Sequence, residues 1–157
     1  MARTGIGYDM HRLVKGRRMV LGGVVIPGEL GLEGHSDADA LCHAVADALL
    51  GAMADGDIGM HFPDTDPQWK DADSLDLLRH VAERVRRRGG NVVNVDATVI
   101  AEVPRVRPYA DSMRERMAQA LSVEMNSVSV KATRAEGMGA IGRREGVAVM
   151  AVATVEV

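Results

Sequence analysis

The fold is organised around residues 37–54, which read DADALCHAVADALLGAMA. Apolar side chains recur there every three or four residues, the spacing that places them on one face of an α-helix. This apolar face consists of Ala38, Leu41, Val45, Ala48, Leu49 and Ala52. The preceding GHSDAD stretch supplies Ser36 or Asp37 as a helix cap, and the free N–H groups of a helix start attract anions. The segment therefore predicts a helix whose beginning binds an anion such as a phosphate.

A polar stripe runs along the same helix, opposite its apolar face, with Asp39, His43 and Asp47 spaced four residues apart. An ordinary solvated stripe carries Lys, Glu or Arg, whereas here a histidine stands one turn from an acid on either side. A carboxylate in that position can orient a metal-bound histidine from the outer shell. The stripe indicates that His43 is a metal ligand and that a neighbouring acid positions it.

The alternating stretch RTGIGYDMH, which ends at His11, has the period of a β-strand. Asp9 and His11 project from the same face, together with Gly5 and Gly7, which allow another backbone to approach closely. Two imidazoles and one carboxylate suit borderline divalent metals, and three protein ligands leave a fourth position open, as in catalytic zinc sites. We therefore predict a metal site at Asp9, His11 and His43. The alternative is an edge strand that ends in two polar residues, with His43 a solvated helix residue.

The remaining elements do not form βαβ units. An extended stretch over 18–26 is interrupted by Gly22 and Gly23, and residues 56–72 form a loop long enough to be functional. The arginines at 86–88 suit the C-terminus of a helix, the alternative being a binding patch. The other predicted elements are a helix from Asp73 or Ser74 to Arg88, a strand over 92–103, a helix starting at Pro108, and strands over 128–133 and 147–155. This order predicts a single α+β domain over residues 1–157, with helices packed on one face of a mixed β-sheet.

Composition excludes several classes of function. The 157 residues carry a net charge of −3 and only 3% aromatic residues, so the chain lacks the basic field and the rows of rings that nucleic-acid binding needs. A single cysteine allows no intrachain disulfide and fits a reducing compartment, so we expect a cytoplasmic protein. The longest apolar run, 147–155, is too short to span a membrane. A core this poor in large side chains favours subunit association.

Eight strings carry a family resemblance, in order along nearly the whole chain. They are YDMH (8–11), GHSDAD (34–39), HAVADALLGA (43–52), GDIG (56–59), FPDTDP (62–67), NVDATVIAEVP (94–104), VKATRAE (130–136) and GRREG (142–146). Together they resemble the family of 2-C-methyl-D-erythritol 2,4-cyclodiphosphate synthases, enzymes of the non-mevalonate isoprenoid pathway. Several motifs in one order are far more specific than any one of them.

The resemblance implies an activity and an assembly. The family's enzymes convert 4-diphosphocytidyl-2-C-methyl-D-erythritol 2-phosphate to the cyclodiphosphate and CMP, by metal-assisted attack of the 2-phosphate on the β-phosphate. Asp9, His11 and His43 would bind Zn²⁺, and Glu136 would contact a second ion, Mg²⁺ or Mn²⁺. The family's fold is an α+β subunit that forms a homotrimer with active sites between subunits and a central channel that can hold an isoprenoid phosphate.

The same resemblance assigns the substrate contacts. His35 and Ser36 would hold the diphosphate. Lys131 and Arg134, which lie close to Glu136 in the sequence, would add fixed positive charge, and the alternative for both is a solvated surface position. The residues implied to hold the ribose or methylerythritol part and to close over the substrate are Asp57, Ile58, Gly59, Phe62, Pro63, Asp64, Thr65 and Asp66. The implied cytidine pocket and its surroundings comprise Ala101, Glu102, Val103, Pro104, Arg105, Val106, Arg107, Thr133, Arg134, Ala135, Glu136, Ala140 and Arg143.

The chain departs from the family pattern at four positions. Arg134 and Ala135 replace two threonines of K-A-T-T-T-E, which affects hydroxyl contacts to phosphate. Ala140 stands where an aromatic residue is common, and Arg144 replaces a glycine of G-R-G-E-G, near the expected channel.

The residues also allow three other functions to be considered. Residues 137–142 match the dinucleotide fingerprint G-x-G-x-x-G, but no βαβ unit surrounds them, so tight turns explain these glycines better. A metal-dependent phosphohydrolase would use the same ligands to activate water. The third alternative is a trimeric module that binds a nucleotide or an isoprenoid phosphate without turnover. The intact metal ligands and Glu136 argue against it.

Overall fold

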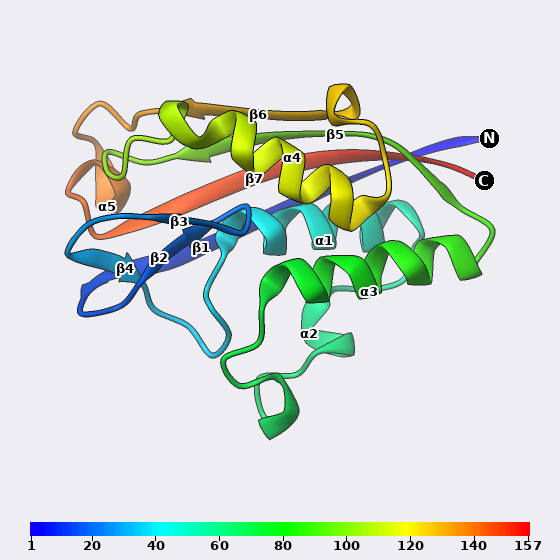
Figure 1. The fold of residues 1–157 in the computed structure, drawn as a ribbon, viewed down its shortest axis with the longest axis horizontal. Helices are drawn as coiled ribbons and strands as arrows, with labels where there is room; N and C mark the ends of the chain where they lie inside the picture. The colour runs from blue at the N-terminus through cyan, green and yellow to red at the C-terminus, as the bar shows by residue number, and fades with distance from the viewer.

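The fold is a five-stranded sheet with helices on one face, seen in a computed structural model that describes residues 1–157 (Figure 1). The strands are β1 (Ala2–Lys15), β2 (Met19–Leu21), β3 (Val24–Ile26), β4 (Leu30–Leu32), β5 (Asn91–Ile100), β6 (Val128–Thr133) and β7 (Gly146–Glu156). The helices are α1 (Ala40–Ala52), α2 (Ile58–His61), α3 (Ser74–Arg87), α4 (Ala110–Leu121) and α5 (Gly139–Gly142).

The sheet is mixed, with strand order β4-β1-β7-β5-β6. Only β5 and β6 are parallel, while β1 and β7 form a long antiparallel pair in the centre. The short strands β2 and β3 pair with each other in a separate two-stranded sheet. This arrangement confirms the predicted α+β class and the mixed sheet.

Two glycines let helix α1 lie directly on strand β1. A Cβ atom at Gly7 would lie 1.8 Å from the carbonyl oxygen of Ala44, and one at Gly5 would lie 2.0 Å from that of Ala48. No side chain fits in either position, as the sequence predicts for a close backbone approach. The contact places His43 of α1 beside Asp9 and His11 of β1.

Helix α1 begins later than predicted. Its N-cap is Asp39, whose carboxylate accepts the Cys42 N–H, rather than Ser36 or Asp37. Ala38 has a left-handed backbone (φ 56°), so the chain turns sharply immediately before the helix. The helix is buried on nearly all sides, because α3, β1 and β7 pack around it. Asp39 and His43 are therefore interior residues and not part of an exposed stripe.

Several short elements depart from the prediction. Strand β5 ends at Ile100 and not at residue 103, and the 56–72 loop contains α2 and a 3₁₀ turn at Pro67–Trp69. Strand β4 is three residues long, too short to show a period, and forms because it pairs with an extension of β1 beyond His11. The GMGAIG stretch forms α5 between β6 and β7, so it is no dinucleotide loop.

Helix α3 starts at Ser74 with Asp73 as its N-cap, as predicted. At its other end the side chains of Arg84 and Arg88 pair with Asp55, near the end of α1. These arginines therefore tie α3 to the turn that follows α1, which favours the structural interpretation of the basic helix end. None of the helices combines the length and the apolar character that crossing a membrane requires.

Candidate metal and substrate site

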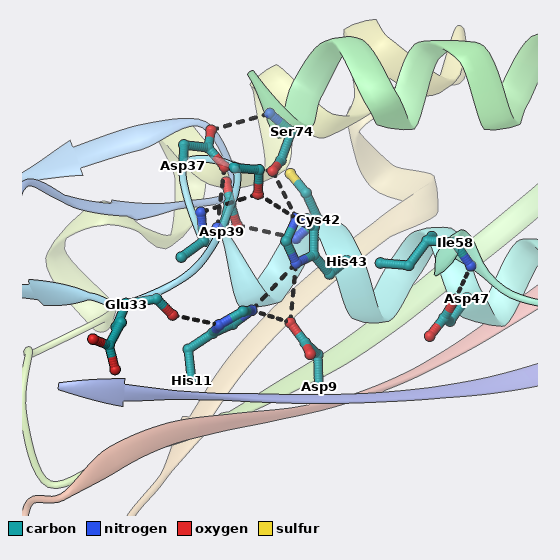
Figure 2. Close-up of polar contacts among 12 residues, drawn as sticks. Asp9, His11, Glu33, Asp37, Asp39, Cys42, His43, Asp47, Ile58 and Ser74 are labelled. Atoms are coloured by element: carbon teal, nitrogen blue, oxygen red, sulfur yellow. Dashed lines mark hydrogen bonds and ion pairs between the residues drawn. The ribbon is translucent and has the colours of Figure 1, made fainter. Parts of the chain in front are cut away.

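Asp9, His11 and His43 converge where β1 meets the first turn of α1 (Figure 2). Asp9 Oδ2 lies 2.8 Å from His11 Nε2 and 3.1 Å from His43 Nδ1, and the two imidazole nitrogens are 3.3 Å apart. Ligand atoms around a tetrahedral zinc ion, each 2.0–2.1 Å from the metal, are separated by roughly 3.3 Å. The three side chains thus present one ligand atom each, at spacings close to those of a divalent metal site.

The His11 ring is oriented by a backbone carbonyl. Its Nδ1 lies 2.8 Å from the carbonyl oxygen of Glu33, which can only accept a hydrogen bond. Nδ1 therefore carries a proton, and a neutral ring then has its lone pair on Nε2, facing Asp9. Metal-binding histidines are commonly held in this way.

His43 is oriented by residues other than those predicted. Its Nε2 contacts Ser74 Oγ at 2.8 Å and Ser36 Oγ at 3.2 Å. The Asp39 carboxylate instead accepts the N–H groups of Gly22, Gly23 and Cys42. The Asp47 carboxylate accepts the N–H of Ile58 and so holds the start of α2. The prediction that an acid one turn away orients His43 is therefore wrong.

The charge state of the cluster also suits a cation. Burial by itself would raise the pKa of Asp9, but hydrogen bonds with His11 and His43 outweigh it and hold that pKa well below its usual range. Burial opposes protonation of His11, yet the hydrogen bond and the charge of Asp9 raise its pKa. The proton that an imidazole holds beside a carboxylate can be replaced by a metal ion, which then binds both groups.

A cavity of about 460 Å³ opens beside the three ligands. Besides the ligands, the predicted site residues that line it are His35, Ser36, Ile58, Gly59, Phe62, Pro63 and Asp64. Gly34, Trp69 and Leu77 line it too and were not predicted as site residues. Phe62 and Trp69 pack edge to face with ring centroids 4.9 Å apart, which joins the 62–69 loop to one wall of the cavity. The cavity is therefore lined by apolar and aromatic side chains as well as by the three ligands.

A second cavity, of about 610 Å³, contains most of the residues predicted for cytidine. Its lining includes Ala101, Glu102, Pro104, Arg105, Val106, Arg107, Thr133 and Arg134. Arg134 forms an ion pair with Glu102 at 2.7 Å, and the same carboxylate accepts the N–H groups of Ala135 and Gly137. Glu102 thus shapes the loop that follows β6. The two cavities share no residue.

The other predicted site residues line neither cavity. Lys131 pairs with Asp96 on the neighbouring strand, Arg143 pairs with Glu145, and Glu136 is exposed with a left-handed backbone. The remaining residues outside both cavities are Asp57, Thr65, Asp66, Val103, Ala135 and Ala140. Asp57 and Asp66 instead cap α2 and the following 3₁₀ turn.

The chain is similar to known proteins along nearly its whole length. Residues 2–156 match the YgbB family. A 2-C-methyl-D-erythritol 2,4-cyclodiphosphate synthase from Salinibacter ruber is 60% identical over 154 residues, which are 98% of each chain. The bifunctional IspDF of Campylobacter jejuni has a similar structure, with a TM-score of 0.95 and 39% identity over 99% of this chain, which spans 42% of that longer protein. A CDP-bound 2C-methyl-D-erythritol-2,4-cyclodiphosphate synthase is similar with a TM-score of 0.90 and 32% identity, covering 98% of this chain and 100% of the other.

Proposed function

The chain belongs to the YgbB family, and we propose that it converts 4-diphosphocytidyl-2-C-methyl-D-erythritol 2-phosphate to 2-C-methyl-D-erythritol 2,4-cyclodiphosphate and CMP. The observation that carries this proposal is the convergence of Asp9, His11 and His43 beside a cavity, in a chain whose similarity to such synthases spans its full length. The reaction belongs to the non-mevalonate synthesis of isoprenoid precursors.

The substrate brings its own nucleophile. An oxygen of the 2-phosphate forms a bond to the β-phosphorus, and the bond from the β-phosphorus to the oxygen that bridges to the α-phosphate breaks, so that CMP leaves. No serine, cysteine or lysine nucleophile is needed. The chain has to fold the substrate so that the two phosphates meet, and to balance their charge.

The metal-binding residues and their neighbours suit that task. Asp9, His11 and His43 would hold Zn²⁺, and Glu136 would contact Mg²⁺ or Mn²⁺. When bound, these ions supply Lewis-acid polarisation of the phosphate oxygens and neutralise charge on the departing CMP. Ser36 Oγ already accepts the Ala38 N–H, so its own proton is available to a phosphate oxygen in the same cavity.

An exposed apolar face supports a homotrimer. On the side of the sheet away from the helices, Ile6 is 65% exposed, Tyr8 55% and Met10 52%. Met150 and Val152, also exposed, lie beside Tyr8 and Ile6 on the paired strand β7. A continuous apolar surface of this kind is typical of a protein interface. We infer that this face packs against its copies around a central channel, where an isoprenoid phosphate would meet Arg143.

The separation of the two cavities supports an active site shared between subunits. We infer that the cytidine pocket over 101–107, with Thr133, belongs to one subunit and faces the metal cavity of its neighbour. Backbone groups over 101–104 would read the cytosine edge. Lys131 and Arg134 would add positive charge there, although each is already paired with an acid, Asp96 or Glu102.

The product of the reaction tests this function. We expect the purified protein, supplied with Zn²⁺ and Mg²⁺, to convert the diphosphocytidyl substrate to CMP and a cyclic diphosphate, which phosphorus NMR distinguishes from linear products. A linear diphosphate would identify a phosphohydrolase instead, and CDP binding without turnover would identify a binding module. Light scattering of the same sample tests for a mass of three chains.

A further inference from the structure

His43 is connected through Ser74 to Asp37, on the side of its ring away from the other ligands (Figure 2). Ser74 Oγ lies 2.8 Å from His43 Nε2, and the Ser74 hydroxyl contacts Asp37 Oδ1 at short range. Asp37 also accepts the N–H of Ser74 at 3.0 Å and that of Asp39 at 3.1 Å. One carboxylate thus joins the start of α3 to the chain entering α1.

The donors and acceptors of this chain of contacts can be assigned. A carboxylate such as Asp37 only accepts hydrogen bonds, so the hydroxyl proton of Ser74 must point toward it. The Ser74 oxygen then has only lone pairs to offer His43, and Nε2 must carry the proton that bridges the 2.8 Å contact. In a neutral ring this leaves the lone pair on Nδ1, the atom that faces Asp9 and His11.

The other groups around His43 do not place its proton on Nε2. Ser36 Oγ accepts the Ala38 N–H and keeps a free proton, so it can either donate to Nε2 or accept from it. The Asp9 carboxylate, 3.1 Å from Nδ1, by itself favours a proton on Nδ1, which would block metal binding. Ser74 is only 1% exposed, so bulk water has no direct access to substitute for its hydroxyl.

We propose that Asp37 and Ser74 are positioning residues that keep the proton of His43 on Nε2 and so prepare Nδ1 to bind the metal. This inference rests on the metal site of the proposed function. It assigns a role to the buried hydroxyl at the start of α3 and to the Asp37 carboxylate, neither of which touches the other two ligands.

The experiment compares four variants of the full chain in two measurements. Ser74→Ala removes the acceptor, Asp37→Ala leaves the hydroxyl but removes the group that directs its proton, and Ser74→Thr keeps the hydroxyl. Asp73→Ala is the matched control, because it removes the N-cap of the same helix without contact to His43. Nitrogen-15 NMR of the metal-free proteins at alkaline pH reports the tautomer of His43. Competition with a chromophoric chelator reports affinity for Zn²⁺ alone.

We expect Ser74→Ala and Asp37→Ala to shift the His43 proton toward Nδ1 and to weaken zinc binding by about 10- to 100-fold, the usual cost of losing such a partner. Ser74→Thr should keep the tautomer and the zinc affinity of the original chain. Asp73→Ala should lower thermal stability but leave the tautomer and the zinc affinity unchanged. The proposal is overturned if Ser74→Ala or Asp37→Ala keeps the original tautomer and zinc affinity, or if Asp73→Ala changes them equally. A wild-type chain that binds no zinc would instead contradict the proposed function, and the NMR readout would still test the tautomer.

Discussion

Replacing Gly7 by alanine should separate the metal ligands without altering any of them. The new methyl group would lie 1.8 Å from the Ala44 carbonyl oxygen, whereas contacts of a Cβ atom below 3.0 Å are essentially never found. Strand β1 and helix α1 must therefore move apart by roughly 1.2 Å at this point, because the Cβ atom is fixed to the backbone of β1 and the oxygen that it meets belongs to the backbone of α1. His43 lies on α1 one residue before Ala44, and Asp9 lies two residues after Gly7, so the separation opens the cluster directly.

The expected cost follows from that displacement. Overpacking of a core costs about 1–3 kcal/mol, and we expect the upper end of that range because backbone cannot rotate away as a side chain can. Ligand atoms now 2.8–3.3 Å apart would lose their common centre, so zinc affinity should fall by more than about 10-fold, the lower cost of disturbing even an outer-shell partner. Urea unfolding measures the stability, and chelator competition measures the affinity.

Gly51→Ala is the matched control, because Gly51 lies on helix α1 and also faces strand β1. A Cβ atom there would lie 3.8 Å or more from its neighbours, an ordinary contact distance. Alanine in a helix is favoured over glycine by about 0.5–1 kcal/mol, so this variant should be as stable as the original chain or more stable. A Gly7→Ala protein with unchanged stability and zinc affinity would refute the argument that this glycine sets the distance between α1 and β1.

Three further predictions address the ligands, the assembly and a charged cluster. His43→Ala should lower both CMP release and zinc affinity by more than about 100-fold, beyond the loss of an outer-shell partner, and an active variant in the product assay would remove the site from the mechanism. Tyr8→Glu should reduce the particle mass in light scattering, because it places a charge on the exposed apolar face, and an unchanged mass of three chains would contradict that interface. Asp55→Asn should cost about 1 kcal/mol at neutral pH, since hydrogen bonds and ion pairs with Arg84 and Arg88 hold the Asp55 pKa below its ordinary value. That stability is present above the unfolded-state pKa and is lost as the pH falls through the lower folded-state value, so acid titration of unfolding should bring the two proteins together. A difference that persists in acid would contradict this origin.

Local patterns predicted the larger elements because their signals lie within a few residues. The helical spacing of Leu41, Val45 and Leu49 and the capping residue Asp73 act over one or two turns, so the sequence alone locates α1 and α3. Strand β4 and helix α2 escaped prediction because three or four residues carry no period. They form through contacts with β1 and with Asp47, which lie elsewhere in the chain.

The metal ligands were predictable for the same reason. Asp9 and His11 share one strand face, and the glycines that precede them indicate a close neighbour. The groups that orient the histidines were not predictable. Every residue has a backbone carbonyl, so nothing in the sequence marks that of Glu33 as the partner of His11. Ser74 lies 31 residues from His43, so no local spacing connects these two residues.

Local patterns alone located the ligands on one face of β1 and on α1, and the order of the motifs indicated the family. Packing set how these ligands are held, how most of the predicted contacts divide between two cavities, and which apolar face stays uncovered. The difference lies in the distance along the chain over which each kind of interaction acts. Periodicity and capping act over a few residues, whereas a hydrogen bond between Ser74 and His43, or a cavity between β1 and the 62–69 loop, exists only after α1 and α3 have packed together.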